Sequence, residues 1–372
     1  MTPTKLVREY PLPAAAQTHE IVEIPGANML VISQQTNSKL VKVSLDPATG
    51  APVRAAAHLI GNPGDGLHGL FASREHPGMV WATLQFTSQI VLIDPVAKNV
   101  DSAPVVKKTY TLPVAAHGPH GVIEDGSTLW VSVKDGCQVV RIDTAAAQPF
   151  AVYPALRRPI FTAVHKSGGL IFATEDSSSN IMWINPTKGE TGQIAIPANM
   201  GSTPVGMVAG PDGNVWFVLI GGASGTGTFG RIRVDKTGTP TIDWYHLAAS
   251  AWKNAGLLHL AWECGEPEQT PSLLLLASSI VSPSTIDAVI RVTFDPSFSA
   301  VNTEASAALP TVACKSHRVL PAKHGWYVTE LSTCQLAHIS RDWVGSGLQR
   351  VDEAGDYYSD FGMGVRANAV DY

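Results

Sequence analysis

Short runs of alternating apolar and polar residues recur along the whole chain, separated by turns rich in Gly, Asp, Asn and Pro. This period of two predicts β-strands, and no window shows the sustained period of 3.6 that would predict a helix. The runs combine into a unit: a small or polar residue, often a His, a Gly or apolar residue, a Gly/Asp turn, a β run, a polar turn and a second β run. The unit occurs seven times, beginning at Thr18, Leu67, Pro119, Pro159, Pro204, Leu258 and Ser316.

The spacing of these units is typical of the four-stranded blade of a β-propeller. Successive starts lie about 40 to 58 residues apart, which fits a blade better than any helical repeat. Each unit supplies three strands, and linking segments such as KKTYTLP and PFAVYP supply a fourth, outer strand that ends in Pro, as an edge strand can. We therefore predict an all-β fold with seven blades, six being the alternative. Residues 1–372 form one domain, with 342–372 as a C-terminal tail or lid.

The N-terminal segment VREYPLP, residues 7–13, resembles these outer strands although no blade precedes it. We expect it to pair with the last blade. Such pairing closes the ring and removes the free sheet edges that promote aggregation.

One position of the repeat predicts a ring of side chains around the axis, because the innermost strand of each blade faces the channel. The residues at this position are His19, His68, His120, Ile160, Val205, His259 and His317. The histidines form an arc over blades 6, 7, 1, 2 and 3, opposite an apolar wall from blades 4 and 5. We expect a small-molecule site there; the alternative is that each His only hydrogen-bonds nearby backbone and was inherited with the repeat.

The end of the second strand predicts another ring. Its members are Gln34, Leu84, Val133, Glu175, Leu219, Ile280 and Glu330. Glu330 shares a blade with His317, and a carboxylate beside an imidazole raises its pKa and fixes its tautomer for acid–base catalysis. We expect Glu175 roughly across the ring; alternatively, both carboxylates cap turns.

Composition and charge exclude several classes of protein. Hydrophobic residues make up 45% of the chain and charged residues 15%, which favours a globular protein. The net charge of −5, without a run of Lys and Arg, argues against nucleic-acid and membrane-surface partners. The N-terminus has no apolar segment of a signal peptide, so a cytoplasmic location is expected. The four cysteines show no CxxC spacing and indicate free thiols.

Imidazoles with one or two carboxylates suit a divalent transition ion, whereas Mg²⁺ prefers oxygen ligands. No HExxH or HxH motif brings such ligands together. We expect no cofactor, with a divalent cation such as Mg²⁺ as the alternative, and the identity of any metal ligand stays open.

Two of the units carry a resemblance to a known family. PHGVIEDGSTLWVSVKDGCQVVRID, and PVGMVAGPDGNVWFVLIGG with FGRIRVD, resemble the repeat of streptogramin (virginiamycin B) lyases, and EYPLP resembles their outer strands. The resemblance covers most of residues 8–341. It implies elimination across a C–O ester bond, with Mg²⁺ polarising the substrate and a His of the last blade as base near a Glu. The matching residues are His317 and Glu330, although only two blades end their second strand in Glu and Lys315 precedes the Ser–His pair.

Propellers similar to this family also act as cyclases in fungal natural-product pathways, including hetero-Diels–Alder catalysts. We therefore predict an enzyme of secondary metabolism that acts on a hydrophobic natural product by C–O elimination or cyclisation. His317 and Glu330 are the predicted acid–base pair, and the substrate-binding residues are His19, His68, His120, Ile160, Glu175, Val205 and His259.

The alternatives are a metal-free pericyclase of tropolone–sesquiterpene biosynthesis, a lactone hydrolase with a divalent ion and an activated water, and a non-catalytic interaction propeller. In the pericyclase and the lactone hydrolase, the binding partner is a hydrophobic small molecule. The sequence does not predict the oligomeric state.

Overall fold

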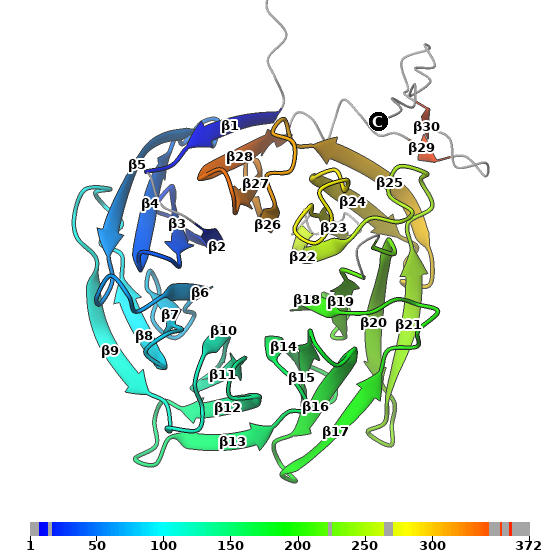
Figure 1. Cartoon of the computed structure of the whole chain (residues 1–372), viewed down its shortest axis with the longest axis horizontal. Helices are drawn as coiled ribbons and strands as arrows, with labels where there is room; N and C mark the ends of the chain where they lie inside the picture. Colours follow the sequence, from blue (N-terminus) through cyan, green and yellow to red (C-terminus); the bar gives the residue numbers. More distant parts are fainter. Residues whose placement is uncertain are drawn as a thin grey trace, which may run out of the picture.

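The computed structural model describes residues 7–13, 17–221, 225–263, 271–341, 350–351 and 357–358. Seven four-stranded antiparallel sheets form a ring about a central axis (Figure 1). The prediction of seven blades is confirmed, and the alternative of six is wrong.

The blades follow one another in chain order, each running from the axis outwards. Blade 1 contains β2 (Thr18–Ile24), β3 (Met29–Gln34), β4 (Lys39–Leu45) and β5 (Pro52–Leu59). Blade 2 contains β6 (Leu67–Ala72), β7 (Val80–Leu84), β8 (Gln89–Asp94) and β9 (Val105–Thr111). Blade 3 contains β10 (Pro119–Asp125), β11 (Thr128–Val133), β12 (Gln138–Asp143) and β13 (Phe150–Pro154).

Blade 4 contains β14 (Pro159–His165), β15 (Leu170–Glu175), β16 (Asn180–Asn185) and β17 (Glu190–Ala195). Blade 5 contains β18 (Pro204–Ala209), β19 (Val215–Leu219), β20 (Thr228–Val234) and β21 (Pro240–His246). Blade 6 contains β22 (Leu257–Glu263), β23 (Ser272–Ala277), β24 (Ala288–Phe294) and β25 (Val301–Ala308).

Blade 7 is completed by the N-terminus, as the outer-strand pattern predicted. Its strands are β26 (Ser316–Ala322), β27 (Gly325–Glu330), β28 (Gln335–Ser340) and β1 (Val7–Pro11). β1 pairs antiparallel with β28 over the register Val7↔Ile339 to Pro11↔Gln335. Because the first strand completes the last blade, the ring is closed by hydrogen bonds between the two ends of the repeat region.

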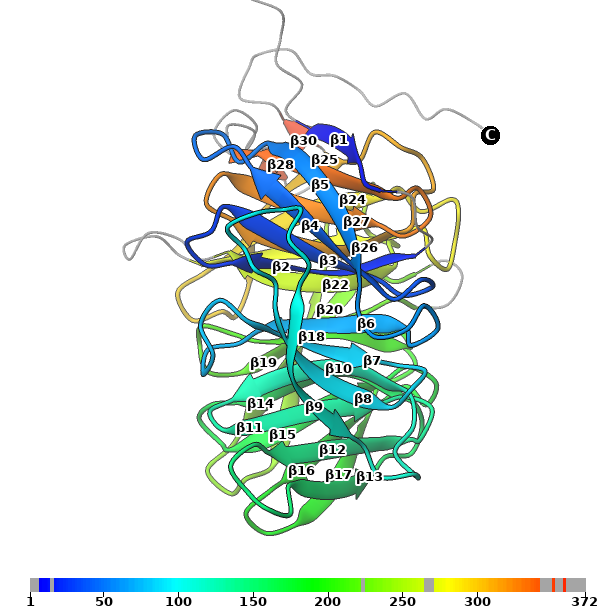
Figure 2. The ribbon, with the colours of Figure 1, turned by 90° about the vertical axis from the view of Figure 1, so that its left-hand side faces the viewer.

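Burial explains the strand pattern of each blade. The second strands β7, β19 and β23 are buried along their whole length, because both of their faces pack against neighbouring blades. Trp81, Trp216 and Trp326, each on a second strand, are almost completely buried between blades. The side chains of the outer strands β9 and β17 are either exposed throughout most of the strand or alternate between exposed and half-buried. These strands lie at the surface of the ring, and Figure 2 shows the outer strands β5 and β9 from the side.

The innermost strands share an irregularity that matters for the site. In six of them the pairing register shifts at the predicted ring residue, for example between Thr18 and Ile21 in β2 and between Ser316 and Arg318 in β26. In β22 it shifts at Leu258, so the prediction of His259 as the ring residue of blade 6 is wrong, and His259 occupies the position after it. A β-bulge breaks the alternation of side chains. Two consecutive residues of each strand can therefore approach the axis.

The rest of the described chain adds little to the ring. Arg350–Val351 (β29) and Tyr357–Tyr358 (β30) form a short hairpin beside β25. The remainder of the predicted tail or lid lies outside the described residues. Cys137 and Cys314 are free thiols. Among the described residues there is no helix with the length and apolar character needed to span a membrane.

Candidate active site at the propeller axis

Four imidazoles pack against one another at the axis. Ring centroids lie 4.5 Å apart for His317 and His19, 4.4 Å for His19 and His68, and 4.1 Å for His68 and His120. These contacts form a continuous arc from blade 7 through blades 1 and 2 to blade 3. His259 of blade 6 stands apart, with its ring 6.2 Å from that of Phe161.

The backbone sets the tautomers of three of these rings. The Nδ1 atoms of His68 and His120 lie 3.0 Å from the carbonyl oxygens of His120 and Ile160, respectively. A carbonyl can only accept, so both rings are protonated on Nδ1 and keep a lone pair on Nε2. His259 has the opposite arrangement: its Nδ1 accepts from the Val319 amide at 3.3 Å, so Nε2 carries the proton.

All five imidazoles are neutral at pH 7. Burial, followed by the charge of Arg318, lowers the pKa of His19 to about 3. Burial also holds the pKa values of His68, His120, His259 and His317 well below the usual range. The expectation that a carboxylate raises the pKa of His317 is therefore wrong: burial and Arg318 lower it.

Arg318, which the sequence analysis overlooked, reaches across the axis. Its side chain is 2% exposed, and its guanidinium carbon lies 4.5 Å from the centroid of Phe161 in blade 4. Nη2 forms an ion pair with Glu20 of blade 1, and Nη1 donates to the His317 carbonyl oxygen at 2.8 Å. One guanidinium thus joins residues of blades 7, 1 and 4.

A signal for this residue was present in the repeat. The residue after the ring position is Gly in blades 2 and 3, because a Cβ at Gly69 would lie 2.4 Å from the His120 carbonyl oxygen and one at Gly121 2.9 Å from that of Ile160. Blade 5 also has Gly there, Gly206, whereas blades 1, 4, 6 and 7 carry Glu20, Phe161, His259 and Arg318. Large side chains at a position that is Gly in blades 2, 3 and 5 mark the blades whose residues reach across the axis.

Several buried nitrogen atoms at the axis lack hydrogen-bond partners. They are His19 Nδ1, His19 Nε2, His317 Nδ1 and Arg318 Nε. The Gln35 amide is close enough to affect the pKa of His19, yet it donates to Gln85 Oε1 at 2.6 Å and makes no hydrogen bond of normal geometry with the ring. A buried polar atom without a partner costs about 1–3 kcal/mol, so such a cluster indicates a place for a ligand or ordered water.

Glu330 faces the closing strand. Its Oε2 atom accepts from Thr333 Oγ1 at 2.5 Å. Burial, with a further contribution from the neighbouring Glu9 of β1, raises its pKa to about 8. Glu9 in turn accepts from the Thr311 amide at 2.8 Å and from Thr311 Oγ1 at 2.7 Å. Within the described residues no hydrogen bond or ion pair joins Glu330 to His317, so the expected pair does not form.

Glu175 is occupied by groups of its own blade and of the segment that leads into it, as the turn-capping alternative predicted. Its carboxylate accepts from the Leu156 amide at 2.9 Å, from Ser178 Oγ at 2.7 Å and from Gln193 Nε2 at 3.2 Å. The sixth member of the second ring was misaligned: the residue opposite Leu257 is Ala277, and Ile280 lies three residues beyond β23.

Ile160 and Val205 form the predicted apolar wall. Both are 5% exposed and belong to one buried cluster with Leu257 and Leu258. The axis therefore combines neutral imidazoles on one side, apolar side chains on the other, and a paired guanidinium between them.

The Mg²⁺ ion that the lyase resemblance implies does not fit these residues. The part of the chain that the structure describes contains no group of three or more His, Cys, Asp and Glu side chains placed to hold a metal ion. Glu175 and Glu330 are bound elsewhere and Glu20 is paired with Arg318, whereas Mg²⁺ requires oxygen ligands.

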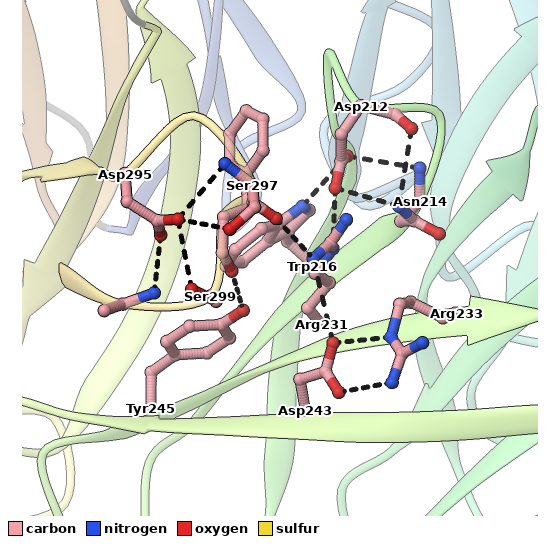
Figure 3. Close-up of polar contacts among 12 residues, drawn as sticks. Asp212, Asn214, Trp216, Arg231, Arg233, Asp243, Tyr245, Asp295, Ser297 and Ser299 are labelled. Carbon is pink, nitrogen blue, oxygen red and sulfur yellow. Dashed lines mark hydrogen bonds and ion pairs between the residues drawn. The ribbon is translucent and has the colours of Figure 1, made fainter.

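A hollow of about 590 Å³ lies on the outer side of blades 5 and 6 (Figure 3). Here Arg231 Nε lies 2.7 Å from Asp212 Oδ2, and Arg233 binds both oxygens of Asp243 at 2.6 and 2.7 Å. Tyr245 donates to the Phe298 carbonyl oxygen. Because these charged groups neutralise one another, we place the candidate site at the axis.

The architecture defines the chain as a closed seven-bladed β-propeller with a histidine-rich axis. No protein-family model matches the chain, and no curated protein matches it. Among solved structures, it is similar to virginiamycin B lyase from Staphylococcus aureus, in a catalytically inactive variant with quinupristin. The TM-score is 0.67 and the identity 18%, over 90% of this chain and 98% of the lyase.

Two further structures show how widely the fold is used. A streptogramin B lyase structure is 19% identical with a TM-score of 0.64, over 89% of this chain and 96% of that one. YCF48 bound to a D1 peptide is 11% identical with a TM-score of 0.58, over 91% and 96%. The resemblance to the lyases is confirmed for the fold, and the same ring also occurs in a peptide-bound protein.

Proposed function

We propose that this protein is a lyase- or cyclase-like enzyme that acts at the propeller axis on a hydrophobic natural product, with His317 as the general base. The observation that carries the proposal is the His317 ring itself. It is buried and neutral, its Nδ1 atom has no hydrogen-bond partner, and it forms the blade 7 end of the imidazole arc, where the charge of Arg318 acts on it. The fold shared with two lyases supports the same class of reaction.

In the elimination, His317 takes a proton from the carbon next to a carbonyl group. The electron pair of the broken C–H bond forms a C=C bond, and the C–O bond to the adjacent carbon breaks, so the oxygen leaves with the bonding pair. In an ester this leaving group is a carboxylate, which departs as the anion, and the imidazolium returns its proton to solvent. A low pKa makes imidazolium a strong acid, which favours this return, and general acid–base catalysis contributes about 10²–10⁴-fold.

The test uses a panel of cyclic depsipeptides and macrocyclic lactones, with and without a free carboxyl group, incubated with the purified protein. Mass spectrometry separates the reactions, because hydrolysis adds one water whereas elimination and cyclisation leave the mass unchanged. We expect a product of unchanged mass, lost in His317→Ala and retained in the surface variant His76→Ala. Full activity of His317→Ala, or a product with added water, would overturn the proposal.

A cycloaddition is the second candidate, and the low basicity of the imidazoles favours it. A pericyclic reaction needs hydrogen-bond donors such as the Nε2–H of His259 to polarise the substrate, and no group has to remove a proton. His317→Gln separates the two, because an amide can donate a hydrogen bond but cannot act as a base at neutral pH. Activity that survives this change supports cycloaddition, and its loss supports elimination.

A further inference from the structure

The charge of Arg318 has one partner among the described residues, the carboxylate of Glu20. The two side chains are 2% and 14% exposed. Burying a guanidinium is unfavourable unless an anion accompanies it. The axis therefore contains a built anion position, and a carboxylate of the protein itself fills it.

The guanidinium is held in place independently of Glu20. The Phe161 ring lies against it at 4.5 Å, and the His317 carbonyl oxygen accepts from Nη1 at 2.8 Å. These two contacts remain when the carboxylate moves away. Arg318 Nε, which has no hydrogen-bond partner, remains available as a second donor for a bidentate anion.

Glu20, in contrast, is held at its backbone. Its amide donates to Ser33 Oγ at 3.0 Å, whereas the side chain has its ion pair with Arg318 and is the more exposed of the two. The side chain can therefore turn out of the axis while the strand stays in register. Glu20 has the properties of an internal substitute for an incoming carboxylate.

The neighbouring imidazoles limit the charge of the ligand. His19 directly precedes Glu20 and His317 directly precedes Arg318, and both rings are neutral with nitrogen atoms free to hydrogen-bond. They add donors or acceptors without adding positive charge. One guanidinium balances one negative charge, so a dianion such as a phosphate monoester is disfavoured.

We infer that the ligand of the axis is a monocarboxylate with an apolar body, and that its carboxylate binds Arg318 by displacing Glu20. The apolar body then lies against Ile160 and Val205, across from the imidazole arc. This assignment rests on the proposed function, because it takes the axis to be the substrate site. Arg318 becomes the specificity-determining residue and Glu20 the competitor that the substrate must replace.

The experiment compares 2-naphthoate with 2-naphthamide, which has the same shape and no charge, by isothermal titration calorimetry. We expect the wild-type protein to bind the acid at least about tenfold more tightly than the amide, since charge-assisted hydrogen bonds are the stronger ones. Glu20→Gln removes the competing charge, so it should tighten naphthoate binding about tenfold further and leave naphthamide unchanged. 2-Naphthyl phosphate should bind no better than naphthoate.

Arg318→Met should abolish the preference for the acid, and Arg231→Met, in the outer hollow, should leave it intact. If Arg318→Met does not fold, Glu20→Gln still tests the idea, because it keeps the cation. Equal binding of acid and amide, or no gain in Glu20→Gln, overturns the inference. Naphthoate selectivity without turnover of any ester in the panel leaves the anion site standing and rejects the enzyme. Turnover that depends on His317, without selectivity for naphthoate over naphthamide, supports the enzyme and rejects the anion site.

Discussion

The axis contains a buried arginine paired with a carboxylate and the outer hollow of blades 5 and 6 a largely buried one, yet they differ in how complete the pairing is. In the hollow, Arg231 pairs with Asp212, which also accepts from the Asn214 side chain at 2.9 Å. At the axis, Arg318 pairs with Glu20, while nitrogen atoms of His19, His317 and Arg318 itself remain without partners. Unsatisfied buried polar groups lower the stability of the fold. Their retention at the axis therefore indicates a function there.

The largest expected effect is loss of stability in acid, caused by the axis. Because the folded-state pKa values of the five axial histidines lie below their unfolded value of about 6.5, the unfolded chain binds more protons at lower pH. Their contribution is complete above pH 6.5 and is lost as pH falls towards 3. We expect a loss on the order of 5 kcal/mol between pH 6.5 and 5.

Denaturant unfolding as a function of pH measures this loss. His19→Gln should reduce the slope by about one proton, or about 1.4 kcal/mol per pH unit. A free energy of unfolding that stays constant between pH 7 and 5 would show that the imidazoles are already protonated or exposed.

The second prediction concerns the outer hollow. Asp212→Ala should lower the free energy of unfolding by about 3 kcal/mol or more, because it leaves Arg231, whose side chain is 12% exposed, without its nearest carboxylate. The control is Arg54→Ala, which breaks a pair with side chains 63% and 45% exposed and should change stability by less than about 1 kcal/mol. Equal effects of the two variants would mean that the hollow is no more ordered than the surface.

The third prediction concerns Glu330 and the closing strand. Its folded-state pKa of about 8 lies above the ordinary value, so its stabilising contribution is full below about pH 4.5 and is lost as pH rises through 8. Glu330→Gln should therefore be more stable than the wild type at pH 9, by on the order of 2 kcal/mol. Thermal unfolding at pH 5 and pH 9 tests this, with the exposed Glu190→Gln as the control. A gain at pH 5 as large as that at pH 9 would contradict it.

The smallest effect compares two buried histidines directly. His165 is 1% exposed, and its Nδ1 accepts from the Gly168 amide at 2.9 Å, whereas His19 is 8% exposed and both of its nitrogens are unpartnered. His165→Phe should lower the free energy of unfolding by about 1–2 kcal/mol, because it leaves the Gly168 amide without an acceptor. His19→Phe should leave it unchanged or raise it by up to about 1 kcal/mol. Chemical denaturation of both variants decides; a larger loss in His19→Phe would show that the His19 ring is structural.

The sequence by itself determined the number of blades, the four-strand plan of each blade, the closure by residues 7–13, and four of the five ring histidines with an apolar wall. These features follow from the local alternation of apolar and polar residues, from repeated turns and from one position counted from the start of each unit. They can therefore be predicted without coordinates. The same counting failed twice in blade 6, where the ring residue is Leu258 and not His259, and where the residue equivalent to Glu330 is Ala277 and not Ile280.

Only the tertiary structure decided which residues meet. The bulge in each inner strand brings Glu20, Phe161 and Arg318 from blades 1, 4 and 7 to one point, although more than 140 residues separate each from the next. The direction of a side chain at a strand end likewise depends on its neighbours: Glu330 turns to Glu9 of the N-terminal strand, far from it in sequence, and leaves His317 to Arg318. Periodicity predicts which residues line the ring, whereas burial and charge pairing between distant strands set their partners and their protonation.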